Sequence, residues 1–340
     1  MTDKELIFTQ ERHLGLITLN RPQALNALTF SMILALQQQL TAWATDSSIH
    51  AVAIRAVEGK AFCAGGDVRW LYEAGRAQNS QQLEFFRQEY HLNQFIYDYS
   101  KPYIALMDGI TMGGGVGISL HGSHPVASER FVFAMPETAI GFFPDIGASY
   151  LLARCPDQIG LYLGLTGNRI QAADAYEFGL VKQVIRSEDF SDVLHALIEA
   201  DLSIDANKQV TDCLSEFAMP VLPLMSTETR ELIAGCFNAK NIESIMSALG
   251  ERNEIELVDN LNQKSPLSLK ITLQQLRQAE KQTLSDCLKI DTILVKHFMQ
   301  GHDFYEGVRA LLIDKDKLPR WQPSTLTQVT KVMVDDYFKG

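Results

Sequence analysis

The sequence predicts an α/β protein in which a strand-rich first part is followed by a helical second part. Short apolar runs typical of buried strands alternate with stretches of helical periodicity up to about residue 190. Two of these runs lead into glycine-rich segments, and such loops lie at strand ends, where open sheets bind ligands. Beyond about residue 201 the strand signals fade while helical periodicity continues. We therefore expect a core over residues 1–200 and a mainly helical region over residues 201–340.

Each expected element rests on its own pattern. Apolar and β-branched runs mark the strands, and apolar residues at helical spacing mark the helices. In the first part the predicted strands are residues 7–9, 14–19, 51–55 and 103–106, and the predicted helices are residues 29–40, 81–97 and 113–120. In the second part the predicted helices are residues 231–249, 267–284 and 288–298, after a proline-bearing connector at residues 219–223.

Composition narrows the classes of function. The 340 residues carry a formal net charge of -11, which argues against a nucleic-acid partner or an anionic membrane surface, because both attract positive charge. No apolar run reaches the roughly 18 residues that span a bilayer, and the N-terminal residues lack the pattern of a signal or transit peptide. We therefore expect a cytoplasmic protein without a membrane partner.

The cysteines, histidines and carboxylates show no spacing typical of a metal site, so no metal is expected. The cysteines are odd in number and scattered, as reduced thiols are. They are Cys63, Cys155, Cys213, Cys236 and Cys287.

Two glycine-rich segments are the first candidate functional features. Residues 59–67 and residues 108–117 each follow a predicted strand. Glycine lets the backbone approach a ligand closely, and N–H groups at a helix start favour negative charge. Taken singly, each segment fits a tight turn or close helix–sheet packing as well as a binding loop. Taken together, they allow one N–H group from each loop to stabilise the charge that acyl transfer develops on a thioester carbonyl oxygen.

A third segment, residues 133–147, places Glu137 and Asp145 in an otherwise apolar stretch. Burial raises the pKa of a carboxyl group and makes it useful as an acid or a base. A carboxylate next to a proline, as Glu137 is next to Pro136, is also typical of a helix cap. The residues themselves leave both interpretations open.

These segments together resemble the enoyl-CoA hydratase, or crotonase, superfamily. The resembling segments of the first part are residues 20–28, 61–67, 109–117, 133–141 and 179–181. More narrowly, the three central segments resemble the branch that hydrolyses 3-hydroxyisobutyryl-CoA in valine breakdown. That likeness continues through residues 265–270, 301–310, 314–316 and 319–321.

The resemblance implies a crotonase-like spiral core of repeated ββα units, followed by C-terminal helices that cover the site and mediate assembly into a homo-oligomer. It places an oxyanion hole on the backbone N–H groups of Ala64 and Gly114, and the catalytic carboxylate on Glu137. Asp145 then binds the substrate hydroxyl or orients the attack. The implied substrate-binding residues are Glu89, Gly114, Glu137, Asp145, Gly65 and Asp67. The implied partner is an acyl-CoA, and no cofactor is expected because coenzyme A is part of the substrate.

One departure from the hydratase pattern bears on the reaction. Hydration of an enoyl-CoA typically uses two glutamates, and the place of the first is taken by Gly117. Thioester hydrolysis needs only an oxyanion hole, one strong carboxylate and a water. A hydratase or isomerase that recruits another acid, and a non-catalytic binding protein of the same fold, are the alternatives. The preference between 3-hydroxyisobutyryl and 3-hydroxypropionyl groups, and the choice between Glu137 as nucleophile and as base, stay open.

Overall fold

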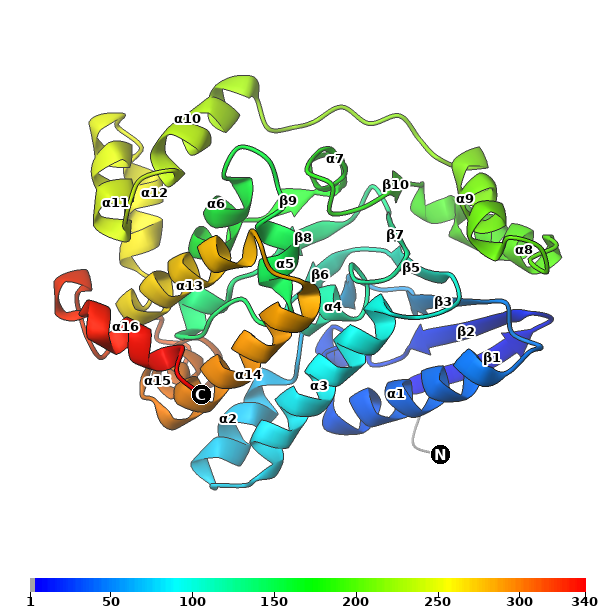
Figure 1. Ribbon diagram of the computed structural model, residues 1–340, viewed down its shortest axis with the longest axis horizontal. Helices are drawn as coiled ribbons and strands as arrows, with labels where there is room; N and C mark the ends of the chain where they lie inside the picture. Colours follow the sequence, from blue (N-terminus) through cyan, green and yellow to red (C-terminus); the bar gives the residue numbers. More distant parts are fainter. Residues whose placement is uncertain (1–3) are drawn as a thin grey trace. The chain divides into compact units, whose positions relative to one another are not determined.

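The computed structural model describes residues 4–340 (Figure 1). Contacts within the chain define two compact units, each built from three stretches of sequence. Unit 1 holds residues 4–66, 91–133 and 170–224, and unit 2 holds residues 67–90, 134–169 and 225–340. The chain therefore passes between the units several times.

Unit 1 is built on two sheets. The larger sheet has the strand order β1-β2-β3-β5-β7-β10, in which β1 and β2 are antiparallel and the other neighbours are parallel. Its strands are β1 (Leu6–Glu11), β2 (Leu14–Leu19), β3 (Ala51–Ala56), β5 (Tyr103–Met107), β7 (His124–Ala127) and β10 (Gln183–Val184). The smaller sheet, in the order β4-β6-β8-β9, consists of β4 (Ala61–Cys63), β6 (Ile110–Met112), β8 (Val132–Ala134) and β9 (Ile170–Gln171).

Consecutive strands of unit 1 are shared between these two sheets. In each of the pairs β3–β4, β5–β6 and β7–β8, the first strand joins the larger sheet and the second joins the smaller one. The glycine-rich segments contain β4 and β6, so the pairing of these two parallel strands brings the two segments together. The repeated strand pairs therefore place the two glycine-rich segments next to each other in the smaller sheet.

One hydrophobic cluster of unit 1 lies on one face of the larger sheet. Alternate residues of its strands point to this face, as the period of two in a strand requires. They pack against α8 (Phe190–Glu199) and α9 (Ala206–Glu216), which follow the last strand (Figure 1). The remaining helical segments of the unit are η1 (Pro22–Ala24), α1 (Phe30–Thr45), the second part of α3 (Gln81–Tyr97), α4 (Gly114–Gly117), α7 (Ala172–Glu177) and η3 (Ser187–Asp189).

Unit 2 is helical. Its elements before residue 170 are α2 (Val68–Arg76), the first part of α3 (Gln81–Tyr97), η2 (Glu137–Ile140), α5 (Ala148–Leu152) and α6 (Ile159–Thr166). Those after residue 224 are α10 (Thr227–Phe237), α11 (Ile242–Glu251), α12 (Ile255–Asn262), α13 (Pro266–Ala279), α14 (Leu284–Gln300), α15 (Asp303–Val308), η4 (Arg309–Ile313), η5 (Leu326–Gln328) and α16 (Lys331–Tyr337).

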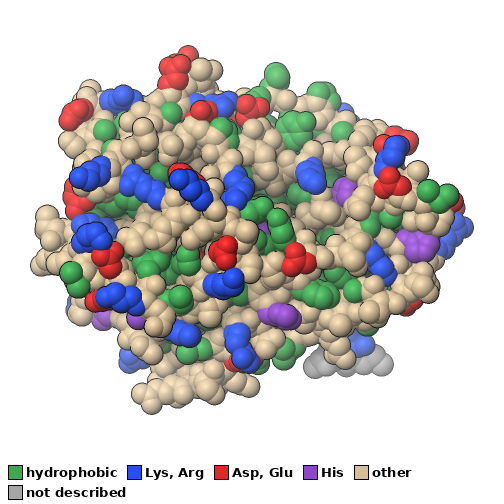
Figure 2. All heavy atoms as spheres, in the orientation of Figure 1, with side chains coloured by type: hydrophobic (Ala, Val, Ile, Leu, Met, Phe, Trp, Pro, Cys, Tyr) green, Lys and Arg blue, Asp and Glu red, His purple; other side chains and the backbone are tan. Residues whose placement is uncertain are grey.

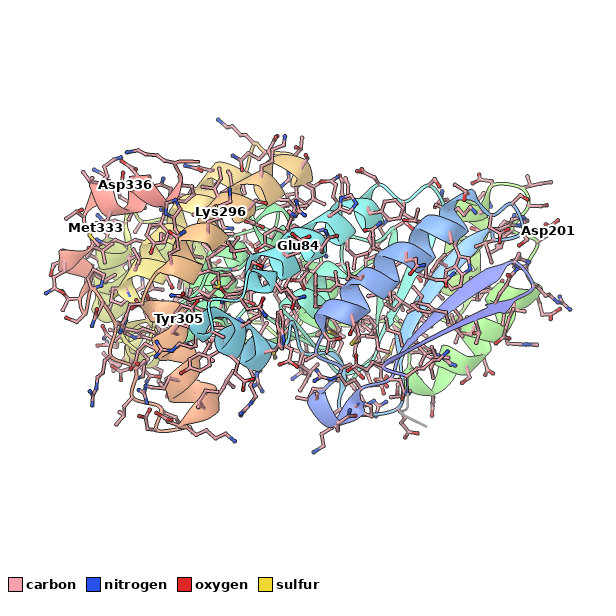
Figure 3. All side chains as sticks on the ribbon, turned by 90° about the horizontal axis from the view of Figure 1, so that it is seen from below. Glu84, Asp201, Lys296, Tyr305, Met333 and Asp336 are labelled. Carbon is pink, nitrogen blue, oxygen red and sulfur yellow. The ribbon has the colours of Figure 1, made fainter. Side chains whose placement is uncertain are left out.

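A hydrogen-bonded tyrosine joins early and late elements of unit 2. The Tyr305 hydroxyl, labelled in Figure 3, donates to the carbonyl oxygen of Met299 at 2.8 Å and accepts from the Gln82 amide at 3.2 Å. The same hydroxyl lies 2.2 Å from where a Cβ at Gly75 would stand, so a larger residue there would displace the Tyr305 side chain. The helices near residue 80 and those near residue 300 are thus fixed to each other.

The α/β class and the helical second part are confirmed, whereas some helix boundaries were predicted wrongly. The single helix expected at residues 231–249 is split into α10 and α11, because the Asn241 side chain accepts from the Ser244 N–H and starts a new helix. The break expected after residue 284 comes earlier, where Thr283 caps α14. The helix expected at residues 113–120 is only α4. As a domain division, the cut at residue 200 stays a prediction.

No helix in the described part of the chain has the length and apolar character needed to cross a bilayer. On the face seen in Figure 2, Lys and Arg side chains are interspersed with Asp and Glu. Positive charge is therefore not gathered into one patch on that face.

Candidate functional site

The two glycine-rich segments of unit 1 lie against each other. Gly65 has a φ of 115°, a backbone conformation that favours glycine. A Cβ added there would stand 3.6 Å from the backbone nitrogen of Gly114, the first residue of α4. On the other side, a Cβ at Gly115 would stand 2.2 Å from the carbonyl oxygen of Cys63. Glycine is therefore favoured at position 65 by its backbone conformation, and at position 115 by the close approach of the Cys63 carbonyl group.

The hydrogen bonds of these segments change one of the predicted oxyanion donors. The N–H group of Ala64 donates to the carbonyl oxygen of Leu25 at 3.0 Å, so the structure does not support a free amide there. The N–H groups of Gly66 and Gly114 have no acceptor within residues 4–340. Gly66 is thus a candidate that sequence reasoning missed. No pattern in the sequence marks Gly66, because the carbonyl oxygen that accepts from the Ala64 amide belongs to Leu25, far away along the chain.

The space at Gly117 is occupied by another side chain of unit 1. A Cβ at Gly117 would stand 2.6 Å from Nδ2 and 3.1 Å from Oδ1 of Asn93, a residue of α3. A glutamate at position 117 would therefore require the Asn93 carboxamide to move. The Asn93 carboxamide thus occupies the space in which a side chain at position 117 would begin.

Unit 2 brings three predicted carboxyl groups together. Glu89 lies on α3, Glu137 is the first residue of η2, and Asp145 lies in the turn before α5. All three side chains are buried. The Tyr90 hydroxyl donates to Oδ2 of Asp145 at 2.8 Å. Glu89 Oε1 and Glu137 Oε2 have no hydrogen-bond partner among the described residues.

Burial dominates the electrostatics of this carboxyl cluster, Glu89, Glu137 and Asp145. Loss of hydration raises the pKa of Glu137 well above its usual value, and the charge of Asp145 raises it further. The pKa of Glu89 is also raised well above normal by burial, then by the charges of Asp145 and Glu137. Burial raises the pKa of Asp145 to about 7, although the Tyr90 hydrogen bond opposes the shift. The cluster can therefore exchange protons near neutral pH.

A fourth buried carboxyl group, that of Asp291, holds the turn that carries Asp145. Oδ2 of Asp291, on α14, accepts from the Gly147 N–H at 2.8 Å, and Oδ1 accepts from the Gln275 amide at 2.8 Å. The same Gln275 amide donates to the carbonyl oxygen of Pro144 at 3.0 Å. Within this turn Ile146 has a φ of 55°, a strained conformation for a β-branched residue. Asp291 and Gln275 fix both ends of a turn that would otherwise relax.

Asp67 has a local structural partner. Its carboxylate accepts from the Trp70 N–H at 3.1 Å and caps α2. Its predicted contact with a substrate stays a prediction, as does that of Gly65. Within residues 4–340, no group of three or more His, Cys, Asp or Glu residues has the arrangement of a metal site.

Comparison with known proteins places the chain among acyl-CoA enzymes. Residues 14–338 match the family described as Enoyl-CoA hydratase/isomerase. The 3-hydroxyisobutyryl-CoA hydrolase, mitochondrial, of Danio rerio is 43% identical over 342 residues, covering 99% of this chain and 90% of the relative. The protein of the same name from Xenopus tropicalis is 42% identical over 344 residues, covering 99% of this chain and 89% of the relative.

A solved structure confirms the expected fold. The crystal structure of a carnitinyl-CoA dehydratase from Mycobacterium thermoresistibile is 35% identical, with a TM-score of 0.92, and the match covers 99% of this chain and 97% of the other. The alternating strand pairs and C-terminal helices are thus those of a crotonase-like fold, as the sequence motifs implied.

Proposed function

Because the chain belongs to the Enoyl-CoA hydratase/isomerase family, we propose that it hydrolyses 3-hydroxyisobutyryl-CoA, and also 3-hydroxypropionyl-CoA, to the free acid and coenzyme A. The observation that carries this proposal is the near full-length identity of about 40% to relatives named for that hydrolysis. The Asn93 carboxamide in the space of a second acid also supports it, because hydration typically uses two.

The proposed mechanism divides the work between amides and carboxyl groups. The N–H groups of Gly66 and Gly114 polarise the thioester carbonyl and stabilise the oxyanion. The ionised Glu137 either attacks that carbonyl or takes a proton from the attacking water. Both routes consume one water and release the coenzyme A thiol and the 3-hydroxy acid. Asp145 assists when ionised, and Glu89 lines the acyl pocket.

The assay that tests this proposal compares two reactions on one preparation. We expect rapid release of free thiol from 3-hydroxyisobutyryl-CoA and negligible hydration of crotonyl-CoA. Hydration without thiol release would contradict the proposal. It would favour instead the second candidate, a hydratase or dehydratase, which the name of the similar solved structure suggests.

Replacing Tyr90 with phenylalanine is expected to move the acidic limb of the pH profile of kcat/KM to higher pH. The phenol O–H stabilises the ionised Asp145 and lowers its pKa, so its loss raises that pKa above about 7. The loss of activity should then grow as the pH falls below about 7 and be small at pH 9. Thiol release measured from about pH 5 to pH 9 checks this.

Tyr99→Phe is a matched control, because the Tyr99 hydroxyl donates to the Leu40 carbonyl oxygen in unit 1. That substitution should leave the profile in place. An unmoved acidic limb in Tyr90→Phe would show that activity does not depend on the ionisation of Asp145.

Cellular location and assembly are also proposals. The sequence favours a cytoplasmic protein, whereas the two vertebrate relatives are named as mitochondrial. We propose a homo-oligomer from the family resemblance, and sedimentation of the purified chain would measure its mass. An acyl-CoA substrate that brings its own coenzyme A, with no additional cofactor, fits the proposed chemistry.

A further inference from the structure

Asn93 is a buried amide whose hydrogen-bonding capacity is unused. The side chain is fully buried, and neither Nδ2 nor Oδ1 has a partner within residues 4–340. Leaving a buried polar group unpaired costs about 1 to 3 kcal/mol. An apolar residue would fill this space without that cost. The amide is therefore expected to have a partner outside the protein chain.

The neighbours of Asn93 indicate which partner. Its carboxamide contacts Gly117 at the end of α4, and α4 begins at Gly114, whose free N–H is a proposed oxyanion donor. On α3, Glu89 precedes Asn93 by four residues, and this spacing puts both side chains on one face of the helix. Glu89 Oε1 is also buried and unpaired. Asn93 thus lies against α4, an element of the same unit to which the proposed function assigns a substrate contact.

We propose that Asn93 binds the 3-hydroxyl group of the acyl chain and so selects 3-hydroxyacyl thioesters. This inference rests on the proposed function. An amide offers a donor and an acceptor, and a hydroxyl group needs one of each, so the two groups satisfy each other. A carbonyl oxygen would use only the donor. The amide is also neutral and cannot protonate a departing hydroxyl group, so it holds the 3-hydroxyl without promoting dehydration.

The test compares a hydroxylated substrate with its deoxy analogue. Thiol release from 3-hydroxyisobutyryl-CoA and from isobutyryl-CoA is measured for the wild type, Asn93→Ala and Asn93→Ser. We expect the wild type to prefer the hydroxylated substrate. Asn93→Ala should lower kcat/KM for that substrate by about 10- to 100-fold and for isobutyryl-CoA by less than about 3-fold. Asn93→Ser keeps a donor and an acceptor and should recover part of the preference.

Gln94→Ala is the matched control. Gln94 is the next residue of α3, and its amide donates to Asp98 at 2.6 Å, so its loss should leave the substrate preference unchanged. Thermal unfolding of each variant separates misfolding from altered recognition. If isobutyryl-CoA turns over too slowly, its inhibition constant against the hydroxylated substrate measures the same preference.

Equal losses on both substrates, or no loss on either, would overturn the role of Asn93 in binding the hydroxyl. A wild type that does not distinguish the two substrates would overturn it as well. The proposed function is tested by the wild type alone: it is contradicted if the wild type releases thiol from neither thioester.

Discussion

Replacing Glu137 with glutamine is expected to lower kcat for thioester hydrolysis by about 10³-fold or more, with a smaller change in KM. Glutamine has nearly the same shape, so the pocket keeps its form, but it can neither attack a carbonyl nor accept a proton. Loss of a general base alone costs roughly 10² to 10⁴ in rate, and loss of a nucleophile costs at least as much. The measurement is thiol release at saturating 3-hydroxyisobutyryl-CoA.

Glu84→Gln is the control for this variant. Glu84, labelled in Figure 3, lies on α3, and its carboxylate accepts a hydrogen bond from Arg87 at 2.8 Å. We expect that change to leave kcat within about 2-fold, because exposed ion pairs contribute little. A Glu137→Gln enzyme that retains a tenth of wild-type activity would exclude Glu137 as the catalytic carboxylate.

Stability provides a second readout that misfolding would not mimic. The pKa of Glu137 is raised in the folded protein, so its contribution to stability is present below its unfolded pKa and is lost as the pH rises through its folded pKa. Glutamine has no proton to lose. The stability of Glu137→Gln relative to the wild type should therefore increase from pH 5 to pH 8 in urea unfolding. A pH-independent difference would mean that Glu137 is not a buried acid.

Replacing Gly115 with alanine is also expected to lower kcat strongly. The added Cβ would lie 2.2 Å from the Cys63 carbonyl oxygen and 2.9 Å from its carbonyl carbon, and neither is a flexible side chain. The end of β4 and the start of α4 must then separate, which displaces the Gly66 and Gly114 amides from each other. Loss of one oxyanion donor costs about 10² to 10³ in kcat, so a decrease of that size is expected.

Gly250→Ala is the control for Gly115→Ala. It makes the same substitution at a position where the added Cβ has no close neighbour. Gly250 lies within α11, and a Cβ there would meet nothing within 4 Å. Alanine should keep full activity and stabilise the helix by about 0.5 to 1 kcal/mol. If both glycine variants retain full activity, the contact between β4 and α4 does not position the oxyanion donors.

The sequence predicted the elements of the core better than it predicted the details of hydrogen bonding, and it singled out carboxyl groups that the structure buries together in unit 2. The apolar patterns predicted α3 and β5 to within one residue at each end, because the spacing of apolar residues along the sequence shows which positions are buried. The identity of the oxyanion donor was not recoverable in this way. Whether the Ala64 or the Gly66 amide is free depends on the carbonyl oxygen of Leu25, which belongs to a distant part of the chain.

The role of Asn93 was also missed, because it depends on a contact between residues that are far apart in the sequence. Nothing in the order of residues shows that Asn93 occupies the space beside Gly117, since that contact depends on how α3 and α4 pack. The capping role of Asp67 was visible in principle, because an aspartate immediately precedes a predictable helix. The split between α10 and α11 could likewise be read from Asn241, a favourable cap within a run of helical periodicity.

Because the Asp291 carboxylate accepts from the Gly147 N–H, the turn before α5 can reach its final structure only after α14 has been synthesised. The turn that carries Asp145 is made when less than half of the chain has been synthesised, but its acceptor lies 144 residues later on α14. Until α14 has left the ribosome, no carboxylate accepts from the Gly147 N–H, and the left-handed conformation of Ile146 is not stabilised. The nascent chain therefore contains Glu89, Glu137 and Asp145 before they reach their final arrangement. A premature stop codon before position 291 would therefore give a product that contains every proposed catalytic residue and is nevertheless inactive.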